Sequence, residues 1–367
     1  MAKKYLISGG GTGGHIFPAI SIANALREAQ PDCEILFIGA ESRMEMERVP
    51  AAGYEIKGLK VDGLDRQNIF KSIKAIWRLL LAQPKARKII KEFKPDVAIG
   101  VGGYASGVAL RVAGKMGIPL ILQEQNSFAG VTNKMLAKYA TKICVAYNGM
   151  ERFFTASKII LTGNPVRQNL LISEDKKGEA YSFFGFDASK PTLFVMGGSL
   201  GARTINEAVI AQLPAIKESG IQLLWQTGKL YFEGAKKAYE PYRCDNIIVT
   251  DFVSNMDLAY LMSDLVVSRA GASSISELCL LKKPTILVPS PNVSEDHQTH
   301  NAMALSTVGA AILIKDVDAV DTLINTALTT IENKDKLQSL STNIATLAQL
   351  NSANRIAEEV MKISKRD

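Results

Sequence analysis

The segment Ser8-Gly-Gly-Gly-Thr-Gly-Gly-His-Ile-Phe-Pro18 stands between the apolar run Tyr5–Ile7 and the helix-forming run 19–26. This order predicts a strand, a glycine loop and a helix. Because glycine has no Cβ, the backbone N–H groups of such a loop can approach an anion at the start of the helix, where the helix dipole favours negative charge. The segment therefore predicts a phosphate-binding turn at the beginning of an α/β domain.

Two other interpretations of the same loop stay open. Gly9, Gly11 and Gly14 match the GxGxxG spacing of dinucleotide folds, although so dense a glycine run meets that spacing almost by chance. A tight turn without a ligand is the second. His15 favours a functional site, because it places a titratable group at the mouth of the loop.

The pattern of strand, loop and helix recurs along the chain. Short apolar runs at 34–39, 54–58, 95–103 and 118–122 alternate with helix-length segments, which indicates βαβ units on a parallel sheet. The run 118–122 leads into Gln123, Glu124, Gln125 and Asn126, and polar groups at the carboxyl end of a buried parallel strand are typical of ligand sites, although a plain surface loop is the alternative.

The pattern restarts after a hinge predicted from the turn formers at 162–167 and the polar stretch 173–190. The strand-like run 191–196 enters a second glycine loop, Gly197–Arg203, and 265–274 parallels 97–106. With 367 residues the chain also exceeds the usual size of one core. We expect two Rossmann-like α/β domains with parallel sheets: residues 1–166 together with the final helical segment 350–367, and residues 167–349.

Charge divides unevenly between these parts. Residues 1–166 hold 23 Lys and Arg against 13 Asp and Glu, whereas the rest of the chain holds 20 against 23. Nine basic residues and one acid lie in 66–94, interleaved with large apolar residues that include Ile69, Phe70, Ile73, Trp77 and Leu80. This pattern predicts contact with an anionic lipid surface, with a solvated helix face as the alternative. Nucleic acid is not expected, because no recognised binding motif accompanies the charge.

The remaining composition is that of an ordinary soluble protein of a reducing compartment. Four cysteines without CxxC spacing argue against a disulfide framework or a zinc site, and no apolar run approaches the length of a membrane span. His297 and His300 have HxxH spacing within the polar segment 289–301, which we expect to be a loop. No third ligand is evident near them, so we predict no metal and assign the segment to hydrogen bonding of a polyhydroxyl ligand.

Seven motifs occur in the order found in the MurG family of family 28 glycosyltransferases, which the chain resembles over nearly its whole length. They are GGGTGGHIFP at 9–18, GGYASG at 102–107, QEQN at 123–126, TGNPVR at 162–167, GGSLGAR at 197–203, RAGASSISE at 269–277 and EDHQTHNA at 295–302. The resemblance implies the GT-B fold, two Rossmann-like domains that face a cleft. It also implies inverting transfer of GlcNAc from UDP-GlcNAc to the 4-hydroxyl of MurNAc in lipid I, giving lipid II for peptidoglycan.

The family motifs also imply roles for individual residues. His15, as candidate base, and Tyr104 would face the acceptor bound by the first domain, and Glu124 is a third candidate catalytic residue. Val253 would present its backbone to the uracil and Glu277 its carboxylate to the ribose. The residues expected around UDP-GlcNAc are Thr12, Gly13, Gly14, Asn126, Arg167, Ser199, Val253, Ala272, Ser274, Glu277 and Gln298. One departure is Leu200, which stands where many members have Gln.

The resemblance further implies no cofactor and no metal, because the helix start at Ser199 and Arg167 would carry the charge of the departing diphosphate. Expected partners are UDP-GlcNAc, undecaprenyl-linked lipid I, the anionic cytoplasmic face of the inner membrane and other proteins of cell-wall synthesis. Alternative functions are a different GT-B lipid glycosyltransferase, a UDP-sugar epimerase, a nucleotide-sugar sensor without activity and an NAD-dependent oxidoreductase. The last of these needs an acid at the end of the second strand, where Gly39 and Ala40 stand.

Overall fold

The computed structural model describes residues 2–41, 43–61, 69–166, 170, 173–198 and 200–364, and the side chains of 69–76 and of 294 lie outside this description. The chain forms two compact units. Unit 1 contains Met1–Val166 and Gln349–Asp367, and unit 2 contains Arg167–Ala348.

Unit 1 is a seven-stranded sheet in the order β3-β2-β1-β4-β5-β6-β7, with all neighbouring strands parallel. Its strands are β1 (Lys4–Ser8), β2 (Glu34–Ala40), β3 (Glu55–Leu59), β4 (Val97–Gly100), β5 (Leu120–Glu124), β6 (Ala140–Val145) and β7 (Ile159–Leu161). Its α-helices are α1 (Gly13–Ala29), α2 (Glu45–Ala51), α3 (Ile69–Phe93), α4 (Tyr104–Lys115), α5 (Val131–Leu136) and α15 (Ser352–Ser364). The strands are short apolar runs because both faces of a parallel sheet are covered by helices.

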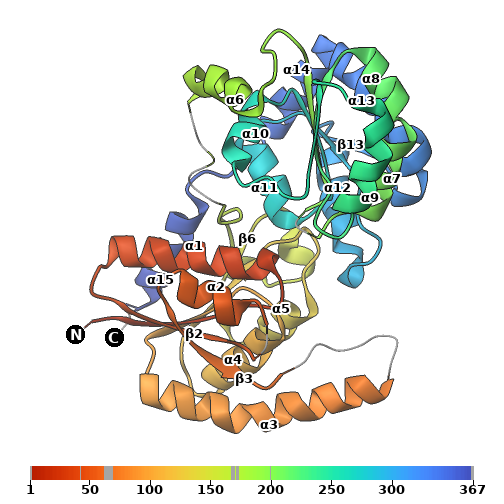
Figure 1. Ribbon diagram of the computed structural model, residues 1–367. Helices are drawn as coiled ribbons and strands as arrows, with labels where there is room; N and C mark the ends of the chain where they lie inside the picture. Colours follow the sequence, from red (N-terminus) through yellow and green to blue (C-terminus); the bar gives the residue numbers. More distant parts are fainter. Residues whose placement is uncertain are drawn as a thin grey trace. The chain divides into compact units, whose positions relative to one another are not determined.

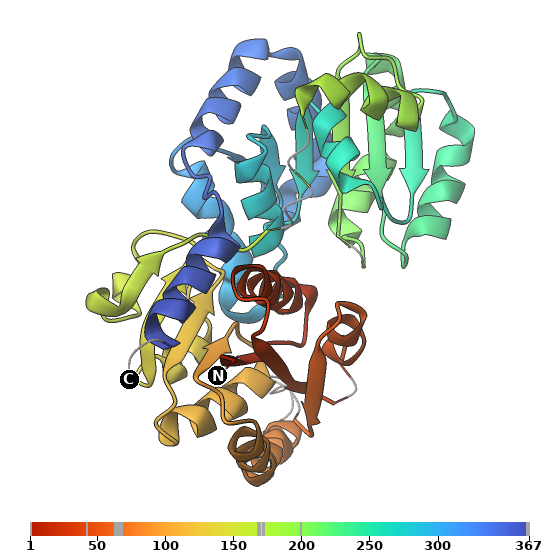
Figure 2. The same ribbon diagram turned by 90° about the vertical axis from the view of Figure 1, so that its left-hand side faces the viewer.

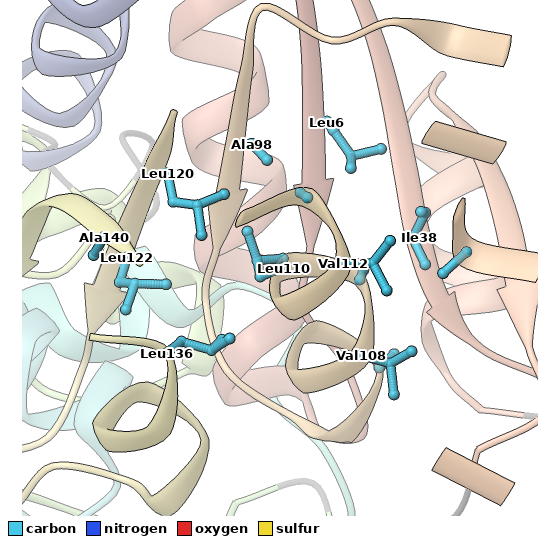
Figure 3. Close-up of a cluster of buried hydrophobic side chains, with 14 of the residues drawn as sticks. Leu6, Ile38, Ala98, Val108, Leu110, Val112, Leu120, Leu122, Leu136 and Ala140 are labelled. Atoms are coloured by element: carbon cyan, nitrogen blue, oxygen red, sulfur yellow. The ribbon is translucent and has the colours of Figure 1, made fainter. Parts of the chain in front are cut away.

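Two apolar layers hold the helices of unit 1 to the sheet. On one face α3, α4 and α5 contribute Ala82, Leu110 and Leu136 to a cluster with strand residues, and Figure 3 shows Leu110 close to Ala98 and Leu120. On the other face α1 and α15 pack together, as Figures 1 and 2 show, and Ile356 and Val360 of α15 are completely buried. The C-terminal helix is therefore an integral part of the unit 1 core.

Unit 2 is a six-stranded parallel sheet in the order β10-β9-β8-β11-β12-β13. Its strands are β8 (Thr192–Met196), β9 (Gln222–Gln226), β10 (Ile247–Thr250), β11 (Leu265–Ser268), β12 (Thr285–Leu287) and β13 (Ile312–Leu313). Its α-helices are α6 (Lys177–Phe184), α7 (Arg203–Ala211), α8 (Leu213–Ser219), α9 (Phe232–Tyr239), α10 (Met256–Met262), α11 (Ala272–Leu280), α12 (His297–Ser306), α13 (Ala319–Glu332) and α14 (Lys334–Ala345).

Two separate parallel sheets confirm the predicted fold class of two Rossmann-like α/β domains. One local prediction was wrong: the predicted polar loop 289–301 contains the start of α12 at His297. Gln123 and Glu124 are the last two residues of β5, at the carboxyl end of a buried parallel strand. α12 forms despite its polar first turn because Ala302 and Leu305, which lie three residues apart on one helix face, are completely buried.

Candidate functional site

The site of unit 1 lies where the strand order reverses, between β1 and β4. The loops that leave these two strands diverge to α1 on one face and α4 on the other, and this switch point is the usual ligand site of open α/β sheets. A Cβ on Gly103 would lie 2.5 Å from the backbone oxygen of Gly10, so the two glycine loops touch. Gly102 and Gly103 have φ of +97° and +92°, a backbone conformation that favours glycine.

His15 lies in this contact. It is half-buried near the start of α1, and a Cβ on Gly102 would lie 2.6 Å from its imidazole ring. Its Nδ1 is 3.5 Å from the Thr12 hydroxyl, and Thr12 is the residue that precedes α1. Tyr104 begins α4 directly after Gly103 and is 41% exposed. The structure therefore brings His15 and Tyr104, which are far apart in sequence, to the same pair of loops.

A buried carboxylate that the sequence analysis missed supports the first glycine loop. Glu45, the first residue of α2, is fully buried; Gly11 N–H and Ala40 N–H each donate to one of its oxygens over 3.0 Å. A Cβ on Gly10 or on Gly39 would collide with this side chain. The expectation that the N–H groups of the loop turn towards a ligand is therefore wrong for Gly11, whose N–H binds an anion from within the protein.

Glu124 organises the loop that follows β5. Its buried carboxylate accepts hydrogen bonds from Asn126 N–H, Gly130 N–H and the side chains of Asn126 and Asn133, over 2.9 to 3.3 Å. Burial raises the pKa of this carboxyl above its ordinary value, and the hydrogen bonds oppose that rise. Within this structure Glu124 holds Asn126 in place.

The site of unit 2 lies at the corresponding switch point, between β8 and β11. The second glycine loop follows β8, and α11 begins with Ala272 shortly after β11. Ser274 lies in the first turn of α11, and Glu277 lies one turn further and is 7% exposed. The Tyr260 hydroxyl of α10 donates to Glu277 Oε2 over 3.1 Å, so a buried phenol orients this carboxylate.

Other predicted residues of this site are already hydrogen-bonded within the protein. Val253 N–H donates to Gln226 Oε1 over 3.0 Å, and Gln298 Oε1 accepts from Ser290 N–H over 2.9 Å. Arg167 and Ser199, together with the side chains of Ile69, Phe70 and Ile73, lie outside the described residues.

A charged cluster that the sequence analysis did not identify secures the loop before α11. The guanidinium of Arg269 donates to the carbonyls of Val288 and Pro289 and to the carboxylate of Asp316, and Asp316 also accepts from Thr204. Within the described parts of the chain, no group of three or more His, Cys, Asp or Glu side chains could hold a metal ion, and His297 and His300 lie on α12. No helix in those parts combines the length and apolar character needed to span a membrane.

Comparison with known proteins identifies the family. Residues 5–145 match the N-terminal domain of glycosyltransferase family 28, and residues 192–360 match its C-terminal domain. The transferase of Phocaeicola vulgatus named UDP-N-acetylglucosamine--N-acetylmuramyl-(pentapeptide) pyrophosphoryl-undecaprenol N-acetylglucosamine transferase is 59% identical over 98% of this chain and 96% of its own. The Parabacteroides distasonis protein of the same name is 57% identical over 98% of this chain and 99% of its own.

A solved structure agrees with these relatives. The crystal structure of Acinetobacter baumannii MurG superposes with a TM-score of 0.80 at 28% identity, over 98% of this chain and 99% of that one. The two parallel sheets of the present chain are thus those of a GT-B glycosyltransferase. The chain belongs to glycosyltransferase family 28 and, within that family, to the MurG transferases.

Proposed function

We infer that this chain transfers N-acetylglucosamine from UDP-GlcNAc to the MurNAc of undecaprenyl-pyrophosphoryl-MurNAc-pentapeptide, the step from lipid I to lipid II in peptidoglycan synthesis. The observation that carries this function is 59% identity to a transferase of that name over nearly the full length of both chains. The test is incubation of the protein with labelled UDP-GlcNAc and a lipid I analogue. Label must appear in the lipid product. Formation of UDP-ManNAc would instead support the epimerase, and binding without turnover would support the sensor.

The two units take different substrates in this proposal. Unit 2 binds UDP-GlcNAc through the loop at 197–203, with Val253 at the uracil, Glu277 at the ribose and Gln298 near the sugar. Unit 1 binds the acceptor at its paired glycine loops, where the start of the 17-residue helix α1 favours the pyrophosphate. The contact of His15 with Gly102, in the loop that follows β4, supports this assignment, because it brings a titratable group to the predicted anion site.

The reaction is an inverting displacement at C1 of GlcNAc. The 4-hydroxyl of MurNAc forms the new bond to C1 from the face opposite the diphosphate, the C1–O bond to UDP breaks, and His15 takes the hydroxyl proton. Tyr104 positions the acceptor, and Glu124 acts by holding the loop that carries Asn126. In this proposal Arg167 and Ser199, together with the start of α7 at Arg203, stabilise the charge that develops on UDP, which removes the need for a metal ion. Activity should therefore persist in EDTA; complete loss that added metal restores would contradict this mechanism.

The division of roles between His15 and Glu277 can be tested separately. His15→Ala should lower kcat strongly and leave the Kd of UDP nearly unchanged, because His15 contacts neither uridine nor diphosphate in this proposal. Glu277→Gln should mainly raise the Kd of UDP and the KM of UDP-GlcNAc. Isothermal titration with UDP and steady-state kinetics measure both effects. An equal loss of UDP affinity in the two variants would refute the assignment.

We also propose that α3 contacts the anionic cytoplasmic face of the inner membrane. Its inner side packs Ala82, Ala86 and Ile90 into the core, whereas Trp77, Leu80 and Leu81 are 62%, 51% and 71% exposed. These three positions lie within one helical turn on a basic helix, the arrangement of a segment that binds a membrane interface. Ile69, Phe70 and Ile73, also predicted to contact the membrane, have side chains outside the described part of the chain.

Vesicle co-sedimentation tests this surface. The protein should bind vesicles that contain phosphatidylglycerol more strongly than purely zwitterionic vesicles, and less strongly at high salt. Leu81→Ser should weaken that binding several-fold, because it removes exposed apolar area from the surface. The matched control is Val317→Ser in unit 2, which also removes an exposed apolar side chain, 82% exposed. Equal binding by the two variants would exclude α3 as the contact.

A further inference from the structure

Gln226 is a buried amide at the carboxyl edge of the unit 2 sheet that the mechanism above does not use. It is the last residue of β9 and is 3% exposed. It pairs with Met196 of β8 on one side and with Thr250 of β10 on the other. The loop at 197–203 follows Met196, and Val253 follows Thr250. Gln226 therefore lies between the two segments to which the proposed function assigns the diphosphate and the uracil.

Both ends of the Gln226 side chain are hydrogen-bonded, one to each segment. Its Nε2 donates to the carbonyl of Gly198 over 3.2 Å, and its Oε1 accepts from Val253 N–H over 3.0 Å. Gly197 N–H also donates to its backbone carbonyl over 3.4 Å. One neutral side chain thus fixes both a φ-positive glycine of the loop, Gly198 at +78°, and the peptide group that joins Phe252 to Val253.

The arrangement has a chemical consequence for base recognition. The hydrogen bond to Gln226 holds the peptide group that joins Phe252 to Val253. It thereby fixes the position of the Val253 backbone, whose own carbonyl, in the next peptide group, is the acceptor offered to the base in this proposal. Such an acceptor pairs with the N3–H of uracil but faces a lone pair on N3 of cytosine. A site built around a hydrogen bond rejects analogues that cannot make it, so fixing this peptide selects the base.

We propose that Gln226 is a positioning residue that couples base recognition to diphosphate binding in the donor site. This inference rests on the proposed function, because it takes the loop at 197–203 and Val253 as the diphosphate and uracil subsites. Gln226 contacts no substrate atom. It acts through Val253 on the choice of base and through Gly198 on the conformation of the diphosphate loop.

The two halves of this role separate in two substitutions. Methionine has a shape similar to glutamine but no hydrogen-bonding nitrogen or oxygen. Gln226→Met should therefore raise the Kd of UDP roughly 10- to 100-fold, because the buried groups of Gly198 and Val253 lose their hydrogen-bond partner. It should also bring the ratio of the Kd of CDP to the Kd of UDP towards one. Gln226→Glu keeps an acceptor for Val253 N–H but places a carboxylate oxygen against the Gly198 carbonyl. It should keep the CDP-to-UDP ratio and reduce the gain in affinity from uridine to UDP at least several-fold.

The matched control is Gln222→Met at the opposite end of the same strand. Gln222 is 2% exposed, and its side chain bonds to Asp187, Lys190 and Thr192, at the edge of the sheet away from the site. This control should lower the unfolding temperature to a similar degree and change neither ratio. If Gln226→Met does not fold, Gln226→Asn takes its place, because an amide one methylene shorter cannot reach both Gly198 and Val253.

Isothermal titration of the full chain with UDP, CDP and uridine distinguishes the outcomes. A wild-type protein that does not bind UDP overturns the proposed donor site and this inference with it. If the wild type binds UDP and the folded Gln226→Met or Gln226→Asn protein keeps the wild-type CDP-to-UDP ratio, the donor site stands and the inference is wrong. The inference is also refuted if Gln222→Met changes both the CDP-to-UDP ratio and the gain in affinity from uridine to UDP, because the effect would then follow from general destabilisation.

Discussion

Replacement of Glu45 by Gln tests whether a buried carboxylate builds the acceptor loop. Each oxygen of Glu45 accepts one backbone N–H, from Gly11 and from Ala40, over 3.0 Å. Gln keeps one acceptor oxygen and turns an NH₂ group towards the other N–H, so one hydrogen bond to a charged acceptor is lost and two donors face each other. A lost bond of this kind costs about 1.5–3 kcal/mol, and a buried unpaired donor costs about 1–3 kcal/mol.

The neutral amide offsets part of this cost, because Gln does not carry the desolvation penalty of a buried charge. We therefore expect Glu45→Gln to lower the free energy of unfolding of unit 1 by about 2 kcal/mol, from the hydrogen-bond costs above. Because Gly11 belongs to the proposed acceptor loop, the variant should also raise the KM of the lipid acceptor, whereas the KM of UDP-GlcNAc should stay unchanged.

Urea unfolding followed by two probes separates the units. Trp225 is completely buried in unit 2, whereas the other tryptophan of the chain, Trp77, is 62% exposed, so fluorescence reports mainly on unit 2 and circular dichroism on both units. Glu45→Gln should shift the dichroism transition and leave the fluorescence transition in place. The control is Glu47→Gln, an exposed position on the same helix, with an expected effect within about 0.5 kcal/mol. Equal stability of the two variants would refute the role of Glu45.

Three further outcomes are expected. Tyr260→Phe should raise the Kd of UDP about 10-fold or more, since Glu277 loses a hydrogen bond to its buried carboxylate; an unchanged Kd in a folded variant would contradict this. Burial lowers the pKa of Lys283 from 10.5 to about 8. Between pH 8 and pH 10.5 the amine of Lys283 is protonated in the unfolded chain and neutral in the folded chain. The free energy of unfolding should therefore rise by about 3 kcal/mol over this range in the wild type but not in Lys283→Met. Parallel pH profiles of the two proteins in urea titrations would contradict this. Gly163→Ala should lower the unfolding temperature by several degrees, because φ is +80° and the added Cβ would lie 2.2 Å from Cβ of Gln349; Gly178→Ala, with open space around it, is the control.

The sequence predicts the parts of this fold that depend on local composition. A strand buried on both faces must be an apolar run, and a loop that passes close to another backbone must be glycine, so β1, β8 and both glycine loops can be recognised without coordinates. The start of α12 could not be found in this way, because its first turn is polar and its burial comes from Ala302 and Leu305 further along.

The residues that support the sites are harder to predict, because their partners are distant in sequence. Glu45 lies 34 residues from Gly11, and Asp316 lies 47 residues from Arg269. No spacing rule relates such pairs, since the distance depends on the path of the intervening chain. Gln226 did carry a signal. It is a polar residue that closes a buried strand directly before Thr-Gly, the same feature that identified Gln123–Asn126.

The two units share one architecture, and the polar side chain behind each glycine loop bears on the proposal that unit 2 takes the nucleotide. In unit 1 the carboxylate of Glu45 already occupies the N–H of Gly11, so a nucleotide diphosphate at that loop would meet a buried negative charge. In unit 2 the corresponding support is the neutral amide of Gln226, which binds a carbonyl of the loop and adds no charge. In the proposed function, this absence of added charge favours the diphosphate of UDP at the loop of unit 2. A UDP complex with the uridine in the Gly9–Gly14 turn would refute this explanation.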